Sequence, residues 1–219
     1  MKKLLLLLLL LSTGLGAISK HRKVKVTTPY GTMIIQLYDQ TPLHRNNFIK
    51  LAKAHFYDSI LFHRVIKGFM IQGGDPESNH AQPGAMLGNG ENGYTVPAEF
   101  RLDLFHRKGV LAAARDDNPA KASSGCQFYI VQGKKWTDAE LDQLEQGRLG
   151  GRKIPVDQRE IYKTIGGTPQ LDQSYTVFGQ VIAGMEVIDK IADMKTDGND
   201  RPLTDVPMKI RLVKKWLLF

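Results

Sequence analysis

The stretch from Leu61 to Asp75 places one arginine among apolar residues. In an extended chain, residues two apart lie on the same face, so Arg64 shares a face with Phe62 and Ile66. A guanidinium in apolar surroundings requires either a carboxylate partner or a polar ligand. This stretch by itself therefore allows two interpretations, a structural salt bridge or a binding group at the rim of an apolar pocket.

Two further faces combine a glutamine with a large apolar side chain. After a break at Gly68, Met70 and Gln72 lie on one face of the next predicted strand. Later in the chain, Gln127 and Tyr129 share a face of another predicted strand. A glutamine amide can both donate hydrogen bonds and accept them. These residues could therefore bind and orient a ligand, but they offer no nucleophile.

The sequence lacks the patterns of the common covalent and metal-dependent enzymes. Its histidines show no metal-ligand spacing, and it contains no G-x-S-x-G, H-E-x-x-H or P-loop motif. The segment Gly88–Gly93 matches G-x-G-x-x-G, but it lies in a predicted loop and is soon followed by Pro97. A dinucleotide site needs a strand before this motif and a helix after it. We therefore expect no metal, no cofactor and no nucleotide.

Composition limits the class of protein and its partners. The 219 residues are 42% hydrophobic and 24% charged, as expected for one globular domain. The formal net charge is +8, but the basic residues are scattered and do not alternate with aromatics, so we expect no nucleic-acid partner. The single cysteine, Cys126, cannot form an internal disulfide, and we expect its thiol to be buried. We also expect a monomer.

The N-terminus has the layout of a secretory signal peptide. Lys2 and Lys3 precede a run of leucines, and small residues follow up to Ala17. The apolar run is too short to span a bilayer comfortably. We therefore predict export, a signal peptide over residues 1–17, and no stable membrane insertion once it is removed. The destination would be the periplasm in a Gram-negative source and the outside of the cell otherwise.

The remaining pattern is one of short strands and two principal helices. Alternating apolar residues predict strands within residues 24–38, 61–75, 109–115, 126–131, 175–182 and 208–219. In the last of these, Trp216 is expected to face the core. One helix is predicted to begin at Pro42, with Thr41 as its cap, and another presents an apolar face from Met185 to Ala192. About eight short strands favour a barrel or a sandwich.

Residues 134–169, which we call the helical hairpin, differ from the strand-rich remainder. Thr137 and Glu140 have the spacing of a capping box at the start of a short helix. A second short helix is predicted over about residues 156–165. The segment is too small to form a core of its own. We interpret it as an insertion in a single domain of residues 23–219.

Four segments of the chain are similar to a known family. These are FHRVIKGFMIQGGDP, GVLAAAR, SSGCQFYIV and YTVFGQVIAGMEVIDKI. In this order and spacing they resemble the cyclophilin family of peptidyl-prolyl cis-trans isomerases, over roughly residues 23–133 and 170–219. The resemblance implies a mainly β protein, with a closed eight-stranded antiparallel barrel capped by two α-helices. It also implies that the substrates are proline-containing polypeptides.

The resemblance further implies roles for individual residues. Arg64 matches the arginine that the family uses for catalysis, and we assign Gln72, which matches a contact to the peptide backbone, to the catalytic set as well. The predicted substrate-binding residues are Phe69, Met70, Ala114, Gln127, Tyr129, Leu171 and Tyr175.

Three positions depart from the residues common in the family. Tyr129 stands where the family commonly has phenylalanine, which adds a hydroxyl at the pocket. Gln170 stands where many members have the tryptophan associated with cyclosporin binding, so the resemblance does not imply cyclosporin sensitivity. Tyr175 stands where some members have histidine.

The sequence therefore predicts an exported isomerase in which Arg64 donates a hydrogen bond to the prolyl nitrogen over an apolar pocket. An alternative is a proline-binding chaperone or adaptor with weak catalysis, whose helical hairpin contacts a partner. A third interpretation, a nucleotide-dependent enzyme built on Gly88–Gly93, would require saturable nucleotide binding, which we do not expect.

Overall fold

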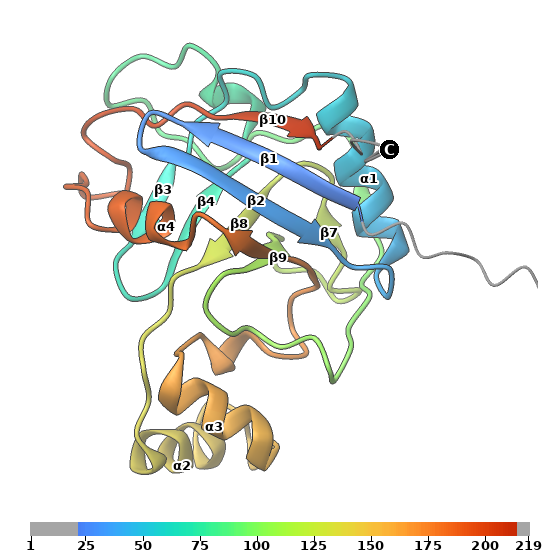
Figure 1. Cartoon of the computed structure of the whole chain (residues 1–219), viewed down its shortest axis with the longest axis vertical. Coiled ribbons are helices and arrows are strands. Elements are labelled where there is room, and N and C mark those ends of the chain that lie inside the picture. The colour runs from blue at the N-terminus through green and yellow to red at the C-terminus, as the bar shows by residue number, and fades with distance from the viewer. Residues whose placement is uncertain (1–21, 214–219) are drawn as a thin grey trace, which may run out of the picture.

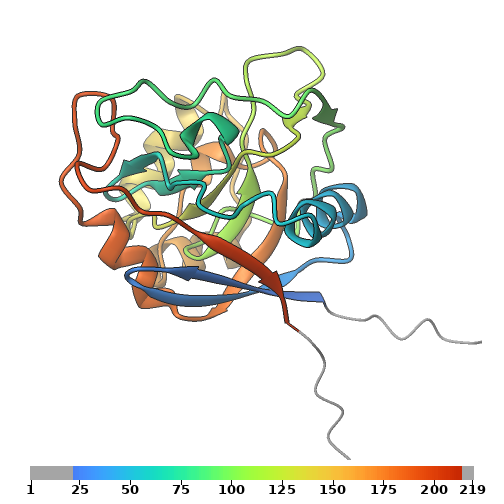
Figure 2. The ribbon, with the colours of Figure 1, turned by 90° about the horizontal axis from the view of Figure 1, so that it is seen from above.

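A computed structural model describes residues 22–213, which form a curled antiparallel sheet with helices around it (Figures 1 and 2). The predicted signal peptide over residues 1–17 and the predicted core position of Trp216 lie outside the described residues. Within residues 22–213, no helix has the length and apolar character needed to cross a membrane.

Eight strands form the main sheet, in the order β10-β1-β2-β9-β6-β8-β4-β3. Their bounds are β1 Arg22–Thr28, β2 Gly31–Leu37, β3 Arg64–Ile66, β4 Met70–Gly73, β6 Val110–Ala113, β8 Phe128–Val131, β9 Val177–Ala183 and β10 Lys209–Leu212. Two further strands, β5 (Thr95–Val96) and β7 (Ser123–Ser124), pair with each other. The helices are α1 Pro42–Lys53, α2 Asp138–Gln146, α3 Val156–Thr164 and α4 Met185–Ala192, with short 3-10 helices η1 Pro76–Ser78 and η2 Pro169–Leu171.

The sheet is open, so the closed barrel expected from the sequence is not formed. Strands β3 and β10 are its two edges, and within residues 22–213 the segments that precede them meet in the single bridge between Leu61 and Pro207. Strand β3 is only three residues long, and at its outer edge the N–H of Val65 donates to the carbonyl of Asp200, in the loop before β10, at 2.8 Å. A hydrogen bond of 2.9 Å from the backbone N–H of Phe62 to the carbonyl of Val206 helps to hold the two segments together across the gap.

The concave side of the sheet holds the core. In β1 the residues alternate between buried and more exposed, with Val24 and Val26 fully buried, and Met33 and Ile35 of β2 pack in the same cluster. Helices α1 and α4 contribute their apolar faces to this cluster, for example through Ile188. Burying each of these large side chains stabilises the fold by about 1.5–3 kcal/mol.

The N-terminus of α1 is capped by a residue that is distant in the sequence. Thr41 precedes the helix as predicted, but its side chain makes no capping hydrogen bond. Instead, the carboxylate of Glu99 accepts hydrogen bonds of 3.0 Å from the backbone N–H groups of Leu43 and His44. A negative charge at this position also complements the helix dipole. The local pattern could not indicate this cap, because the chain supplies it from 55 residues away.

The helical hairpin lies at one end of the molecule, away from α1 and α4 (Figure 1). The predicted capping box of Thr137 and Glu140 is present at the start of α2. The hairpin leaves the sheet beside Gly133 and returns at Gly167, where the two backbones touch. A Cβ atom on Gly133 would lie 2.4 Å from the Cα of Gly167, so this contact requires glycine.

A small apolar cluster fills the hairpin. Leu141, Ile154 and Tyr162 are its buried members, and Phe105 from outside the hairpin packs against them. The cluster therefore joins the hairpin to the rest of the chain.

Candidate active site

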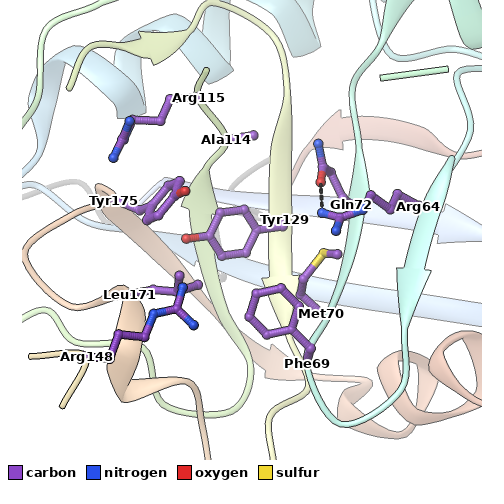
Figure 3. A pocket seen from close by; sticks show the side chains of 10 residues that line it. All are labelled: Arg64, Phe69, Met70, Gln72, Ala114, Arg115, Tyr129, Arg148, Leu171 and Tyr175. Carbon is purple, nitrogen blue, oxygen red and sulfur yellow. Dashed lines mark hydrogen bonds between the residues drawn. The ribbon is translucent and has the colours of Figure 1, made fainter. Parts of the chain in front are cut away.

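Eight of the nine predicted site residues line one cavity of about 320 Å³ (Figure 3). The lining residues are Arg64, Phe69, Met70, Gln72, Ala114, Arg115, Tyr129, Arg148, Leu171 and Tyr175. Gln127 is the predicted residue that does not line the cavity, and Arg115 and Arg148 are two lining residues that were not predicted.

The strand register explains why residues distant in the sequence meet here. Arg64 of β3 pairs with Gln72 of β4, and Gln72 pairs with Tyr129 of β8. Directly opposed residues of antiparallel strands point to the same face of the sheet. The register therefore places the three side chains in one row across three neighbouring strands.

The guanidinium of Arg64 lies half-exposed at the rim of the cavity. Its Nη1 donates a hydrogen bond of 3.4 Å to Oε1 of Gln72, and its Nε lies 3.4 Å from Oδ2 of Asp200. The two side chains of this ion pair are 43% and 42% exposed, so the pair contributes little to stability. Both interpretations from the sequence therefore apply to Arg64. It forms a salt bridge with Asp200, and its guanidinium also borders the apolar pocket.

Gln127 lies behind this row and holds it in position. Its Oε1 accepts a hydrogen bond of 3.1 Å from Nε2 of Gln72, and the side chain is buried. Its own Nε2 donates to the backbone carbonyls of Gly88 and Gly90, at 2.8 Å and 2.9 Å. The glycine-rich segment that matched G-x-G-x-x-G is therefore a loop fixed to Gln127.

Aromatic and aliphatic side chains form the apolar part of the cavity. The rings of Tyr129 and Tyr175 meet edge to face, with centroids 5.9 Å apart. The guanidinium of Arg115 lies 4.8 Å from the centre of the Tyr175 ring, in a cation–π contact. Phe69 and Met70 form the floor on the side nearer to Arg64 (Figure 3). Such a surface suits a compact apolar ring.

The hydroxyl of Tyr129 is not free in the pocket, although the sequence suggested that it would add polarity there. It lies 3.0 Å from Nε2 of His106, which is fully buried. Nδ1 of the same ring lies 2.8 Å from Oδ1 of Asp172. A carboxylate can only accept, so Nδ1 carries a proton, and Nε2 is the ring nitrogen that faces the hydroxyl of Tyr129. Burial raises the pKa of Tyr129 well above its usual value, which keeps this hydroxyl protonated.

Sequence reasoning missed His106, Asp172 and the two arginines Arg115 and Arg148. The first two are separated by 66 residues in the sequence and meet only in the folded structure. Arg115 directly follows Ala114 and could have been found as its neighbour, whereas nothing in the sequence places Arg148 near the cavity.

Metal-ligating clusters and the thiol of Cys126 are two further features of residues 22–213 that bear on reactivity. No group of three or more His, Cys, Asp or Glu side chains in this part of the chain could hold a metal ion. The thiol of Cys126 is buried, as predicted, and burial raises its pKa to about 11. It is therefore protonated at neutral pH and a poor nucleophile.

The comparisons with known proteins agree with the fold. Residues 23–213 match the family described as cyclophilin type peptidyl-prolyl cis-trans isomerase/CLD. A protein of Staphylococcus haemolyticus named as a peptidyl-prolyl cis-trans isomerase is 39% identical over 185 residues, which cover 84% of this chain and 87% of that protein. A protein of Staphylococcus aureus strain USA300 with the same name is 40% identical over 185 residues, with the same coverage of both chains.

A solved structure shows the same fold. The cyclophilin type peptidyl-prolyl cis-trans isomerase of Cryptosporidium parvum superposes with a TM-score of 0.65 at 24% identity, covering 89% of this chain and 99% of that one. The chain belongs to the cyclophilin family. It is an enzyme that isomerises peptidyl-prolyl bonds, and its substrates are proline-containing polypeptides.

Proposed function

We propose that Arg64 accelerates the rotation of X–Pro bonds by donating a hydrogen bond to the prolyl nitrogen while the proline ring occupies the apolar cavity. The observation that carries this proposal is the position of the guanidinium. It is half-exposed at the rim of a cavity lined by Phe69, Met70 and Tyr129, and its orientation is set by Gln72.

The chemistry of the bond explains why a guanidinium suits this task. Amide resonance gives the C–N bond partial double-bond character and a rotation barrier of about 18–20 kcal/mol. Twisting the bond localises the lone pair on the nitrogen, which then becomes a better hydrogen-bond acceptor. A donor aimed at this atom stabilises the twisted state more than the planar one, as catalysis requires. Arginine as a residue type is always charged in proteins and offers several fixed donors.

The magnitude of the effect requires more than one group. A rate gain of about 10⁵ corresponds to roughly 7 kcal/mol of the barrier. A single charged hydrogen bond contributes about 1.5–3 kcal/mol. Ring binding by the cavity and backbone contacts around Gln72 and Ala114 would supply the remainder.

The function in the cell follows from the N-terminus. We propose that the chain is exported and acts as a monomer on other exported proteins during their folding, in the periplasm if the source is Gram-negative. The motivation is the lysine, leucine and small-residue pattern of residues 1–17. N-terminal sequencing of the protein secreted by its own host tests this, and an intact Met1 would refute cleavage.

A second candidate function is a proline-binding chaperone or adaptor with weak catalysis. The observation that favours it is the exposed apolar surface of the helical hairpin, where Val156 is 78% exposed and Ile165 is 50% exposed. In this case the variant Arg64→Ala would still suppress aggregation of an unfolded client, although it no longer accelerates refolding.

The test of the catalytic proposal is the isomerisation of a short proline peptide, measured by NMR exchange spectroscopy. We expect Arg64→Ala to lower kcat/KM by at least about tenfold, which corresponds to 1.4 kcal/mol or more. Arg211→Ala is the matched control, because it removes an arginine that is paired with Asp58 away from the cavity. Equal activity of Arg64→Ala and the wild type would refute the mechanism.

A further inference from the structure

We propose that Arg148 makes this enzyme selective for prolines that are flanked by an anionic side chain, a carboxylate or a phosphate. The proposal rests on the function proposed above, since it takes the proline ring to occupy the cavity. It assigns a substrate class to the enzyme and a binding role to the helical hairpin, from which Arg148 comes.

The cavity has a marked charge asymmetry. Three of its ten lining residues are arginines, and none is acidic. Arg64 has the carboxylate of Asp200 at 3.4 Å, and Arg115 has that of Asp117 at 3.6 Å. Arg148 makes no hydrogen bond or ion pair with any residue in the range 22–213. Of the three arginines at the cavity, Arg148 is therefore the one without a counterion among residues 22–213.

The backbone around Arg148 is fixed, although its side chain is free. The N–H of Leu149 donates to the carbonyl of Leu144 at 3.0 Å, and that of Gly151 donates to Glu145 at 2.7 Å. The side chain of Leu149 packs against the apolar cluster of the hairpin. Nη2 of Arg152 donates to the carbonyl of Asp172 at 3.1 Å, which ties this turn to the segment that follows η2. The turn therefore holds the Cα of Arg148 beside the cavity.

The position of Arg148 suits a residue that flanks the proline. In Figure 3, Arg148 and Leu171 lie on one side of the Tyr129 ring and Arg64 lies on the other. A peptide whose proline ring rests on Tyr129, with its nitrogen near Arg64, has room to continue past the opposite wall. A side chain from a neighbouring residue of the peptide can then meet Arg148.

The type of residue indicates the type of ligand. A guanidinium binds carboxylates and phosphates through two parallel hydrogen bonds, which an ammonium group cannot do. An exposed ion pair contributes about 0.2–1 kcal/mol, which corresponds to a preference of about 1.4- to fivefold. A phosphate carries about −1.5 to −2 charges at pH 7. The enzyme's preference for a phosphorylated side chain should therefore exceed its preference for a carboxylate.

The experiment compares matched proline peptides with the purified full chain, again by NMR exchange. Three pairs place either glutamate or its neutral isostere glutamine directly before the proline, directly after it, or two residues after it. A further set places phosphoserine or serine at the same three positions. At low salt we expect kcat/KM to favour the anionic member in at least one position, by about two- to fivefold for glutamate. The preference should fall as the salt concentration rises.

Two variants of Arg148 and one control assign the effect. Arg148→Gln should bring the anionic-to-neutral ratio of kcat/KM close to one, and Arg148→Glu should invert it. Lys135→Glu, an exposed charge reversal elsewhere on the hairpin, should leave the ratio at its wild-type value. If Arg148→Gln fails to fold, Arg148→Lys is measured in its place. This variant keeps the charge and should retain part of the preference.

The outcomes separate this proposal from the one on which it rests. Catalysis of both peptides with no preference at any position would overturn the selectivity and leave the proposed function standing. A preference that persists in Arg148→Gln would overturn the role of Arg148. If the wild type isomerises neither member of any pair, both proposals fail. A preference for phosphoserine without one for glutamate would support the phosphate class alone.

Discussion

The hydroxyl of Tyr162, on the inserted helix α3, donates a hydrogen bond of 2.7 Å to Oδ2 of Asp172. The other carboxylate oxygen of Asp172 accepts from the backbone N–H and from Nδ1 of His106, and Nε2 of His106 is hydrogen-bonded to the hydroxyl of Tyr129 in the cavity. All four of these side chains are buried. A continuous polar chain therefore joins the helical hairpin to Tyr129 in the lining of the cavity.

The variant Tyr162→Phe tests how much this chain stabilises the fold. Removing the hydroxyl leaves Oδ2 of Asp172 buried without its donor, a change that costs about 1–3 kcal/mol. We expect a lower free energy of unfolding by this amount in urea denaturation. Tyr30→Phe is the control, because no hydrogen bond from the Tyr30 hydroxyl occurs within the described residues. An unchanged unfolding midpoint for Tyr162→Phe would contradict the role given to this hydrogen bond.

The same substitution also tests whether the two ends of the polar chain are coupled. Tyr129→Phe removes the hydroxyl at the other end, so the two substitutions form a double-mutant cycle in the free energy of unfolding. Groups in one hydrogen-bonded network are usually coupled by about 0.5–3 kcal/mol. If the changes in the free energy of unfolding caused by the two substitutions simply add, the two ends of the polar chain act separately.

The variant Gln127→Ala should lower catalysis although Gln127 does not line the cavity. It removes the acceptor that orients Gln72 and both donors that hold the loop at Gly88 and Gly90. Since Gln72 orients Arg64, we expect kcat/KM to fall by about tenfold, the equivalent of one lost hydrogen bond of 1.4 kcal/mol.

A matched glutamine distinguishes this effect from a general loss of stability. Gln158 is also buried and donates to a backbone carbonyl, that of Leu102, but it lies in the helical hairpin and not at the cavity. Gln158→Ala should cost stability and leave kcat/KM close to the wild-type value. If both variants, measured well below their melting temperatures, lose activity equally, Gln127 does not position the catalytic row.

Stability should fall on acidification because of His63. Burial lowers the pKa of this histidine to about 4, from an ordinary value near 6.5. Between these values the unfolded chain binds a proton that the folded chain does not, so stability is complete above pH 6.5 and is lost as the pH falls towards 4. The difference of about 2.5 pKa units corresponds to about 3 kcal/mol.

The measurement is urea unfolding of the wild type and of His63→Phe at pH 7.5 and pH 4. The variant lacks the titrating group, so its loss of stability between the two pH values should be smaller by about 3 kcal/mol. Parallel pH profiles for the two proteins would show that His63 is accessible to protons in the folded state.

Much of the fold could be predicted because the relevant signals are local. The alternation of apolar residues in Val24–Leu37 and the capping box at Thr137 depend only on neighbours in the chain, and both were found in the structure. Predictions failed where a distant segment intervenes. Glu99 replaces Thr41 as the cap of α1, and the segments around Leu61 and Pro207 meet in one bridge instead of the longer ladder that would have closed the barrel.

The sequence by itself determined the chemical character of the site. Arg64, with apolar residues on its own face and two glutamine-bearing strands elsewhere, indicated binding and polarisation without a nucleophile. Only the tertiary structure decided which groups are free to act. In the fold, the hydroxyl of Tyr129 is hydrogen-bonded to His106, the amide of Gln127 is hydrogen-bonded to a loop, and Arg148 lines the cavity. The physical reason is that side-chain types follow from the sequence, whereas hydrogen-bond partners depend on packing between segments far apart in the chain.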